Sequence, residues 1–525
     1  MPMHRRQNRR SGAVLLAVLV TIVILSLMAY QYSDRMTSEY QAAYNSHKYA
    51  QARSFADSGF QYTAALLASP DNITNLLGGN PYNNPDMFAN ILVPDSESKG
   101  NAGRFTLVAA NDPNNSTGSY RAGVTDENGK ININSFIKID PTGNTLYAML
   151  QKLPNMTPDI AASIVNWVLP SSATPIDGGA LDDYYTTLSP SYQCKHGPFD
   201  TIDELLLVRG VTRELLFGSD LNRNGINDPD ETSASGSVDR GWIDFLTVYS
   251  REPNRDDAGH ALVWINDTDI TTLYENLSSA VGEDLAKFII LYRQYGPSNT
   301  AGTQQSLVSS LLNLVGVQTK PAATTTTVQG VLANYQVNLQ KKPAQTFSTY
   351  FDMITAQVSV AGTGQGTKTT IYTSPLTSPD QIAALLPILI KTTTLTQDAE
   401  IPARININTA PPEVLACLPN FTETDLTTIL AARPQYSANQ PIADNFKTIG
   451  WLFTDANIKV AVMRKMEKML TTRSQVYHMM VVGSFDNQKG PTGRIEAIID
   501  QNYGRPRIVF WRDWSELGKT NLPPQ

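Results

Sequence analysis

The sequence has few of the side chains from which catalytic and metal centres are usually built. Its two cysteines, Cys194 and Cys417, lie far apart without metal-ligand spacing, so an oxidising compartment permits a disulfide between them but nothing requires one. The five histidines are scattered, and no zinc-protease, nucleophile-elbow, P-loop or dinucleotide-binding motif occurs. The sequence therefore predicts a protein that is not an enzyme.

Charged side chains are also scarce. Asp, Glu, Lys and Arg make up 17% of the chain, and the formal net charge is −7. Because an acidic chain is repelled by the phosphates of nucleic acids, we expect no nucleic-acid partner. The low charged fraction, together with the many Asn, Thr, Ser and Gln residues, is typical of exported proteins.

The N-terminal region lacks both charge and proline. No charged residue occurs from Ser11 to Ser33, and no proline between Pro2 and Pro70. The apolar run that begins at Ala13 is long enough, as a helix, to cross a bilayer core of about 30 Å. A cluster of arginines precedes the run, so we expect one membrane span with these arginines in the cytosol and the body outside it. A cleaved secretory signal is the alternative, which the length of the run disfavours.

The helical pattern continues beyond the expected membrane span. Over residues 34–69, apolar residues recur at spacings of three and four, which predicts a stripe that packs against a globular body. This stripe contains Met36, Tyr40, Ala43, Phe55, Ala56, Phe60, Ala64 and Leu67. We therefore expect one continuous helix of about 55 residues, or ~80 Å in length.

An internal repeat organises the middle of the chain. The string Ile-Asn-Ile-Asn occurs at residues 131–134 and again at 405–408, and a Leu-Pro-Asn hairpin follows each copy, at 153–157 and 418–422. A weaker copy begins at residues 264–267. Helical patterns flank each hairpin, which predicts helix-hairpin-helix-like units. The hairpins lack the glycine pair that would present backbone N–H groups to a phosphate, so we interpret the units as a structural scaffold rather than a DNA-binding site.

Short strand-like segments lie at both ends of the body. Residues 104–110 and 119–125 precede the repeats, and residues 475–483, 494–500 and 506–511 follow them. The sequence thus predicts an α+β fold, in which the long N-terminal helix packs on an antiparallel sheet and a large α-helical domain is inserted between early and late strands.

A basic leader that ends in glycine, followed by an apolar helix that becomes amphipathic, resembles the type IV pilin and pseudopilin superfamily. Most of its members carry Glu five residues after the cleavage site, where this sequence has Ala17. The chain resembles the K-type minor pseudopilin of type II secretion systems, which also lacks that Glu. The segments that carry the resemblance are residues 126–132, 198–210, 405–418 and 477–518.

The resemblance implies a structural tip subunit of a periplasmic pseudopilus, which helps to start its assembly and drive export of folded proteins. It implies cleavage by prepilin peptidase after Gly12 and methylation of Ala13. It also implies a single-pass location in the bacterial inner membrane with a periplasmic body, and I- and J-type minor pseudopilins among its pseudopilin partners. Two alternatives stay open: a membrane-tethered helix-hairpin-helix DNA-uptake protein and a type IV pilus tip protein.

The expected domain organisation follows from the hypothesis that the chain has a pilin-like fold. We predict a leader at 1–12, the N-terminal helix at 13–69, the first part of the pilin-like body at 70–125, the inserted helical domain at 126–250 and 401–472, an additional insertion with a Thr/Gln-rich linker at 251–400, and the C-terminal strands at 473–525.

Residues 220–231 match the pattern of an EF-hand-type calcium loop. Six oxygen ligands are expected, namely side chains of Asp220, Asn222, Asn224, Asp228 and Glu231 and the carbonyl of Ile226. Without a cation the acidic residues would repel one another. The Ser/Gly-rich sequence after the loop does not predict an exiting helix, so we expect Ca²⁺ to act as a structural clamp. An acidic turn without calcium is the alternative.

The resemblance to the K-type family also implies calcium in this inserted region. It places a second acidic stretch at residues 177–183, where Asp177, Asp182 and Asp183 are the candidate ligands of a second Ca²⁺ ion. Other acidic positions of the family pattern are occupied here by Leu181 and by a Pro-Ser-Ser run.

Overall fold

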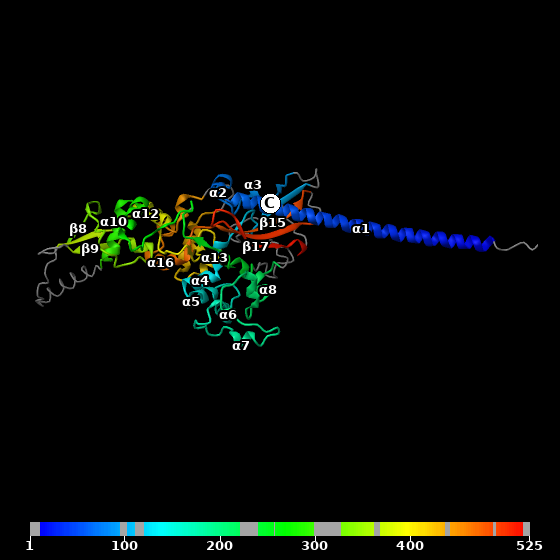
Figure 1. The fold of residues 1–525 in the computed structure, drawn as a ribbon, viewed down its shortest axis with the longest axis horizontal. Helices are drawn as coiled ribbons and strands as arrows, with labels where there is room; N and C mark the ends of the chain where they lie inside the picture. The colour runs from blue at the N-terminus through cyan, green and yellow to red at the C-terminus, as the bar shows by residue number, and fades with distance from the viewer. Residues whose placement is uncertain are drawn as a thin grey trace, which may run out of the picture.

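In the computed structural model (Figure 1), the described residues are 11–94, 102–110, 120–220, 240–256, 258–298, 327–361, 368–435, 442–486 and 490–517. They form a long protruding helix, a sheet body around the C-terminal part of that helix, and a block of helical units that lies beside the sheet body and extends beyond it (Figure 1). The predicted fold class is confirmed: a long N-terminal helix packs on an antiparallel sheet, and the inserted region is mostly helical.

Helix α1 runs unbroken from Ser11 to Leu67, as the absence of proline predicts. Its side chains are exposed from Gly12 to His47, and Lys48 is the first that is buried. The Lys48 ammonium lies 4.4 Å from the ring centroid of Phe485, at the edge of the sheet body. The helix therefore has a bare N-terminal part and a packed C-terminal part.

The predicted apolar stripe is correct for only the packed part of α1. Phe60 and Leu67 are buried against the sheet body, whereas Met36, Tyr40 and Ala43 are exposed. The correction has a simple reason, since the body of this chain reaches the helix only at Lys48. An apolar stripe beyond that point has no packing partner within the described chain.

The sheet body holds one antiparallel sheet with strand order β1-β2-β15-β16-β17, in which β3 also pairs with β15. The strands are β1 (Ile91–Leu92), β2 (Gly103–Val108), β3 (Thr125–Asp126), β15 (Val476–Phe485), β16 (Gly493–Asp500) and β17 (Arg507–Asp513). Two short helices, α2 (Pro70–Leu76) and α3 (Pro85–Phe88), and the 3-10 helix η8 (Ser515–Leu517) complete it. Four of the five predicted strands are confirmed. The fifth, at 119–125, is wrong for most of its length, since within the described part only Thr125 lies in a strand and Arg121 makes an isolated bridge to Ala109.

The core of the sheet body lies between α1 and one face of the sheet. Helix α1 crosses β2, β15 and β16 and packs most extensively on β15. Phe60 belongs to a buried cluster with Leu107 and Val481. Gly483 lets the helix come close, because a Cβ there would lie 2.3 Å from the Ala52 carbonyl oxygen.

Three helical units share one plan among the described residues: each begins and ends with a two-residue strand, and the two strands pair in parallel. The first unit (131–247) contains β4 (Ile131–Asn132), α4 (Ile133–Ile139), α5 (Asn144–Leu150), α6 (Pro158–Val168), α7 (Asp182–Tyr185), η2 (Ile202–Leu207), α8 (Arg213–Phe217), η3 (Trp242–Asp244) and β5 (Leu246–Thr247). The third unit (405–471) contains β13 (Ile405–Asn406), α13 (Pro412–Cys417), α14 (Glu423–Ala432), η6 (Asp444–Lys447), α15 (Trp451–Thr454), α16 (Val460–Met466), η7 (Glu467–Met469) and β14 (Leu470–Thr471).

The second unit (263–394) is the weaker repeat of the sequence and lies at the end of the molecule farthest from the free end of α1 (Figure 1). It contains β7 (Val263–Trp264), α9 (Ile270–Val281), α10 (Glu283–Tyr295), β8 (Thr327–Gln329), η4 (Leu332–Asn334), η5 (Tyr350–Met353), β9 (Gln357–Ala361), β10 (Thr369–Thr373), α12 (Pro379–Thr392) and β11 (Thr393–Thr394). Strands β6 (Glu252–Pro253) and β12 (Glu400–Ile401) pair antiparallel, so the chain enters and leaves this unit side by side.

An equivalent asparagine makes the same internal hydrogen bond in each unit. In every unit, an asparagine three residues after the start of the opening strand donates to the backbone carbonyl of a phenylalanine at 2.9–3.0 Å. The pairs are Asn134 with Phe199, Asn266 with Phe347, and Asn408 with Phe446. In the first two units the phenylalanine N–H also donates back to the asparagine. The second unit therefore shares the parallel strand pair and the asparagine contact of the other two, and adds a three-stranded sheet of its own, β8-β10-β9.

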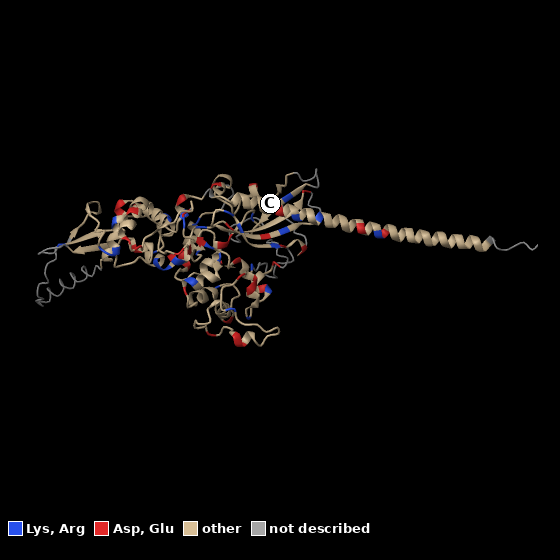
Figure 2. Cartoon of the chain, in the orientation of Figure 1, with Lys and Arg blue, Asp and Glu red and all other residues tan. Residues whose placement is uncertain are grey.

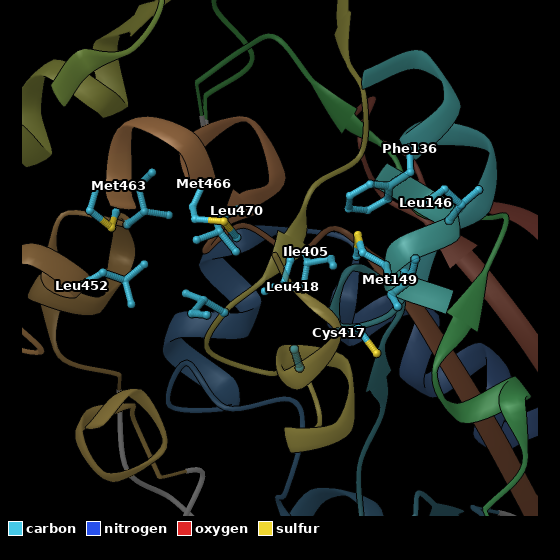
Figure 3. Close-up of a cluster of buried hydrophobic side chains, with 14 of the residues drawn as sticks. Phe136, Leu146, Met149, Ile405, Cys417, Leu418, Leu452, Met463, Met466 and Leu470 are labelled. Carbon is cyan, nitrogen blue, oxygen red and sulfur yellow. The ribbon is translucent and has the colours of Figure 1, made fainter. Parts of the chain in front are cut away.

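The three units are packed into one block around a continuous apolar core. Figure 3 shows Phe136 and Met149 of the first unit facing Ile405 and Leu418 of the third. Cys417 is buried in this region and, like Cys194, is a free thiol, so the permitted disulfide is not formed. Burial raises the pKa of Cys417 to about 12. We refer to the three units together as the three-unit block.

Candidate functional site

The bare part of α1 is the candidate membrane anchor. Among the described residues, Gly12–Leu67 is the one helix long and apolar enough to cross a membrane, with a mean hydropathy of 2.8 in an 18-residue window that is fully exposed. Figure 2 shows the outermost stretch of α1 free of charged side chains, in contrast to the part of the helix nearer the body and to the body itself. Gly12 and Ala13, the predicted processing residues, lie in its first turn, and Ala17 is exposed one turn later. Cleavage between Gly12 and Ala13 would leave the apolar helix intact.

The predicted calcium loop begins at the end of the first unit. Asp220 follows α8, is half-buried, and lines a cavity of about 260 Å³ between the sheet body and the first and third units. The other five predicted ligands lie outside the described residues: Asn222, Asn224, Ile226, Asp228 and Glu231. The calcium site therefore stays a prediction, for which the structure fixes only the position of the first ligand.

The structure does not bring the candidate residues of the second calcium site together as ligands. Asp182 accepts a hydrogen bond from the Cys194 N–H at 2.8 Å and lies 3.5 Å from His196 Nε2. Asp183 accepts from the following backbone N–H, and Asp177 is exposed. Within the described ranges, no group of three His, Cys, Asp or Glu side chains is placed to hold a metal ion.

The two Leu-Pro-Asn hairpins form tight turns. Asn155 and Asn420 have φ values of 58° and 68°, the left-handed conformation that asparagine tolerates better than most residues. Thr157 and Thr422 then cap the following helices by accepting a hydrogen bond from a backbone N–H three residues on. The hairpins thus use their own side chains to satisfy the N-termini of α6 and α14.

Acidic residues make these helix N-termini unsuitable for a phosphate. Asp159 lies in the first turn of α6, and Glu423 and Asp425 lie in the first turn of α14. Asp425 also accepts from the Thr422 N–H at 2.9 Å. Carboxylates occupy the position where the helix dipole would favour an anion, which disfavours phosphate binding at both hairpins.

A buried carboxylate joins the sheet body to the third unit. Asp126 of β3 accepts hydrogen bonds from Ser474 Oγ at 2.6 Å, Thr409 Oγ1 at 2.6 Å, Asn406 Nδ2 at 2.8 Å and the Asn128 N–H at 2.7 Å. Burial raises the pKa of Asp126 to about 6, although these hydrogen bonds favour its charged form. Asp126 therefore ties the repeat motif of the third unit to the sheet.

A second buried group joins the sheet body to the first unit. Lys130 Nζ lies 2.8 Å from Glu127 Oε1, and both side chains are buried. The Thr247 hydroxyl of β5 donates to the other Glu127 oxygen. We call the contacts of Asp126, Glu127 and Lys130 the polar seam, because they lie between the two hydrophobic cores.

A further buried ion pair joins the two segments through which the chain enters and leaves the second unit. Arg404 donates to both carboxylate oxygens of Glu252, with Nε at 2.9 Å from Oε2, and Thr471 Oγ1 donates at 3.2 Å. Burial pushes the pKa of Glu252 upward, but Arg404 and its other partners together hold it below its usual value. This pair has no signal in the local sequence, because 152 residues separate its members. The role of Asp126 was not predicted either, although this residue opens the string Asp-Glu-Asn-Gly-Lys-Ile-Asn.

Two regions of the chain are similar to a known family. Residues 129–217 and residues 405–459 match two domains of the family described as type II secretion system (T2SS), protein K. These regions cover most of the first and third units. A search of curated proteins gives no match. A solved structure titled as the GspK-GspI-GspJ complex from the type 2 secretion system of enterotoxigenic Escherichia coli aligns with 10% identity and a TM-score of 0.36, over 91% of this chain and 98% of that chain.

Proposed function

The chain carries both protein K domains and is a K-type minor pseudopilin of a type II secretion system, and we propose that it caps the distal end of the pseudopilus. The observation that carries this proposal is the place of the two matched domains. Both belong to the three-unit block, which lies beside the sheet body and extends beyond it, away from the bare part of α1 (Figure 1). A block in that place would prevent a further subunit from stacking above it.

The bare part of α1 is proposed to hold the subunit in the bacterial inner membrane, with the body in the periplasm. Its exposed apolar side chains suit a lipid environment, and the arginines before it favour a cytosolic N-terminus. Prepilin peptidase would cut between Gly12 and Ala13 and leave Ala13 as the methylated N-terminus. After cleavage the same helix would pack among the helices of other subunits in the fibre.

The I- and J-type minor pseudopilins are the proposed partners. Ala17 supplies no carboxylate for the N-terminal amine of another subunit, which suits a subunit that has few neighbours above it. The GspK protein of enterotoxigenic Escherichia coli is described in a complex with GspI and GspJ. We propose the corresponding complex for this chain.

Co-expression of the full chain with I- and J-type pseudopilins and prepilin peptidase tests this function. A ternary complex should be isolated from detergent-solubilised membranes, and mass spectrometry should find Ala13 at the N-terminus of this chain. In a type II secretion strain without its own K-type subunit, the chain should restore export. Failure to form the complex, together with failure to restore export, would refute the proposal.

Calcium is proposed to clamp the loop that follows α8. Asp220, Asn222, Asn224, Asp228 and Glu231, with the Ile226 carbonyl, supply hard oxygen ligands at the spacing that Ca²⁺ requires. A bound ion would neutralise the carboxylates of the loop, whose first ligand, Asp220, lines the cavity beside the polar seam. This supports a role in fixing the first unit against the sheet body rather than in sensing.

Thermal unfolding with and without Ca²⁺ tests the clamp. At a free Ca²⁺ concentration about 100-fold above the dissociation constant, binding should stabilise the chain by about 2.7 kcal/mol. An Asp220→Ala/Glu231→Ala variant should lose this response, and an Asp177→Ala/Asp183→Ala variant should keep it if the ion binds only in the first loop. An unchanged melting temperature in the intact chain would remove calcium from the function.

A further inference from the structure

The outermost strand of the sheet has an uncovered face. Strand β17 is the last in the order β1-β2-β15-β16-β17, and α1 packs on β2, β15 and β16 instead. On β17, Trp511 pairs with Ala497 and Ile508 pairs with Ile499. Directly paired residues lie on the same face of a sheet, so Trp511 and Ile508 lie on the face that α1 covers farther in.

The exposure of these side chains changes abruptly at the edge of α1. Ala497 and Ile499 are fully buried under the helix, whereas Trp511 is 42% exposed and Ile508 is 56% exposed. Side chains of this size lose a large apolar area to a partner when they become covered. The α1-side face of β17 is therefore an apolar strip without a partner among the described residues.

The width of the uncovered strip matches that of one helix. Helix α1 packs chiefly on β15, and β17 lies two strands away from β15. With about 4.8 Å between neighbouring strands, the axis of β17 is ~10 Å from that of β15. Packed helices have interaxial distances of about 8–10 Å, so a second helix over β17 would lie at an ordinary packing distance from α1.

The side of α1 that faces this strip can also accommodate a closely packed helix. Arg53 marks this flank, because its Nε lies 2.8 Å from Asp513 Oδ2 at the end of β17. At helical spacings of four and seven from Arg53, the same flank carries Ser46, Tyr49 and Asp57, and all three are exposed. The short side chains of Ser46 and Asp57 leave room for another helix beside α1, and Tyr49, which is 49% exposed, offers that helix a contact on α1 itself.

We propose that the N-terminal helix of a neighbouring pseudopilin lies in this channel, between the Arg53 flank of α1 and the α1-side face of β17. This inference rests on the proposed function and assigns the element of the partner that is bound. A helix that packs along the bare part of α1, which ends at His47, enters the channel by continuing in the same direction. Ile508 and Trp511 form the apolar floor that this helix covers.

Site-specific photo-crosslinking in the full chain, co-expressed with I- and J-type pseudopilins, tests the channel. A benzophenone amino acid replaces Trp511 in one variant and Leu92 in the control. Leu92 lies on β1, at the opposite edge of the sheet, and is 52% exposed. The variant at 511 should give crosslinks to the N-terminal helix of an I- or J-type subunit, and the control should give at least fivefold less.

A second pair of variants measures the contribution of the floor. Ile508→Lys/Trp511→Lys should lower the amount of co-purified I- and J-type subunits at least tenfold, while Leu92→Lys should leave it unchanged. The proposed channel would be contradicted by crosslinks from position 511 that map to a globular domain of the partner. Equal crosslinking from positions 511 and 92 would also contradict it. If the unmodified chain captures no pseudopilin at all, the proposed function itself fails, which separates the two results.

Discussion

The sheet body and the three-unit block differ in how their cores are assembled. The sheet pairs Phe105 of β2 with Gly483 of β15, so its core depends on segments that lie more than 370 residues apart in the chain. The three-unit block instead repeats one local plan, in which a parallel strand pair and an asparagine contact close each unit. The sheet body can therefore accept a very large insertion, because the insertion folds by its own local contacts.

The two regions are joined mainly by polar contacts rather than by a common core, with one aromatic contact between Tyr249 and Phe510. Their buried apolar clusters are separate, and the polar seam lies between them. Arg512 of β17 adds an ion pair with Asp203 of the first unit at 2.8 Å. Hydrogen bonds fix direction more strictly than apolar packing does, so the seam sets how the block is held on the body.

The largest predicted effect comes from the buried ion pair between the segments that lead into and out of the second unit. Glu252→Ala leaves Arg404 without its carboxylate in a buried site, which typically costs about 3–5 kcal/mol. We expect guanidinium unfolding of the full chain in detergent, followed by tryptophan fluorescence, to show a loss of this size.

An exposed ion pair serves as the matched control for that loss. Asp444 lies 2.6 Å from Lys447, and both side chains are mostly exposed. Asp444→Ala should leave the unfolding midpoint unchanged, because solvent screens such a pair. Equal effects of the two substitutions would contradict the account of Glu252 and Arg404 as a buried pair.

A smaller effect is expected from the pH response of the polar seam. The folded-state pKa of Asp126 is about 6, above its unfolded value near 3.8, so the folded chain binds this proton more tightly. The resulting stability is complete below pH 3.8 and is lost as the pH rises through 6. Two pKa units correspond to about 2–3 kcal/mol. Unfolding free energies measured from pH 4 to pH 8 should fall accordingly.

Two variants separate the contribution of the polar seam to this pH dependence from that of the three-unit block. Asp126→Asn should flatten the response between pH 4 and 6. Glu467 of the third unit accepts from the Tyr350 N–H, and burial raises its pKa to about 7, so Glu467→Gln should flatten the response at higher pH. A pH dependence that survives both substitutions would assign it to other groups.

The sequence was sufficient for the long helix, for most of the sheet and for two of the units. An apolar run without proline has few alternatives to a helix, and the short β-rich segments lie where the strands form. It did not indicate where α1 stops packing, because Met36 and Tyr40 are as apolar as the buried positions. Their exposure depends on the reach of the body, which a helical pattern does not encode.

The second unit was predicted only as a weak repeat, although a further signal was present. Each unit carries the string Phe-x-Thr followed by Ile or Tyr, beginning at Phe199, Phe347 and Phe446. These phenylalanines are 38–81 residues from their asparagine partners, so their shared role became visible only in the fold. For the candidate site, the calcium pattern could be read from local spacing, whereas the Glu252–Arg404 pair could not.

The smallest effects should show whether the three units are energetically alike. Asn134→Ala, Asn266→Ala and Asn408→Ala each remove an asparagine that donates to a phenylalanine carbonyl, and each should cost about 1–2 kcal/mol in unfolding free energy. Asn445→Ala, at an exposed position of the third unit, is the control and should cost less than about 0.5 kcal/mol. Because the apolar core is continuous through the block, the three losses should appear in one unfolding transition. A negligible loss for Asn266→Ala alone would mean that the second unit repeats the geometry of its neighbours without repeating its energetic basis.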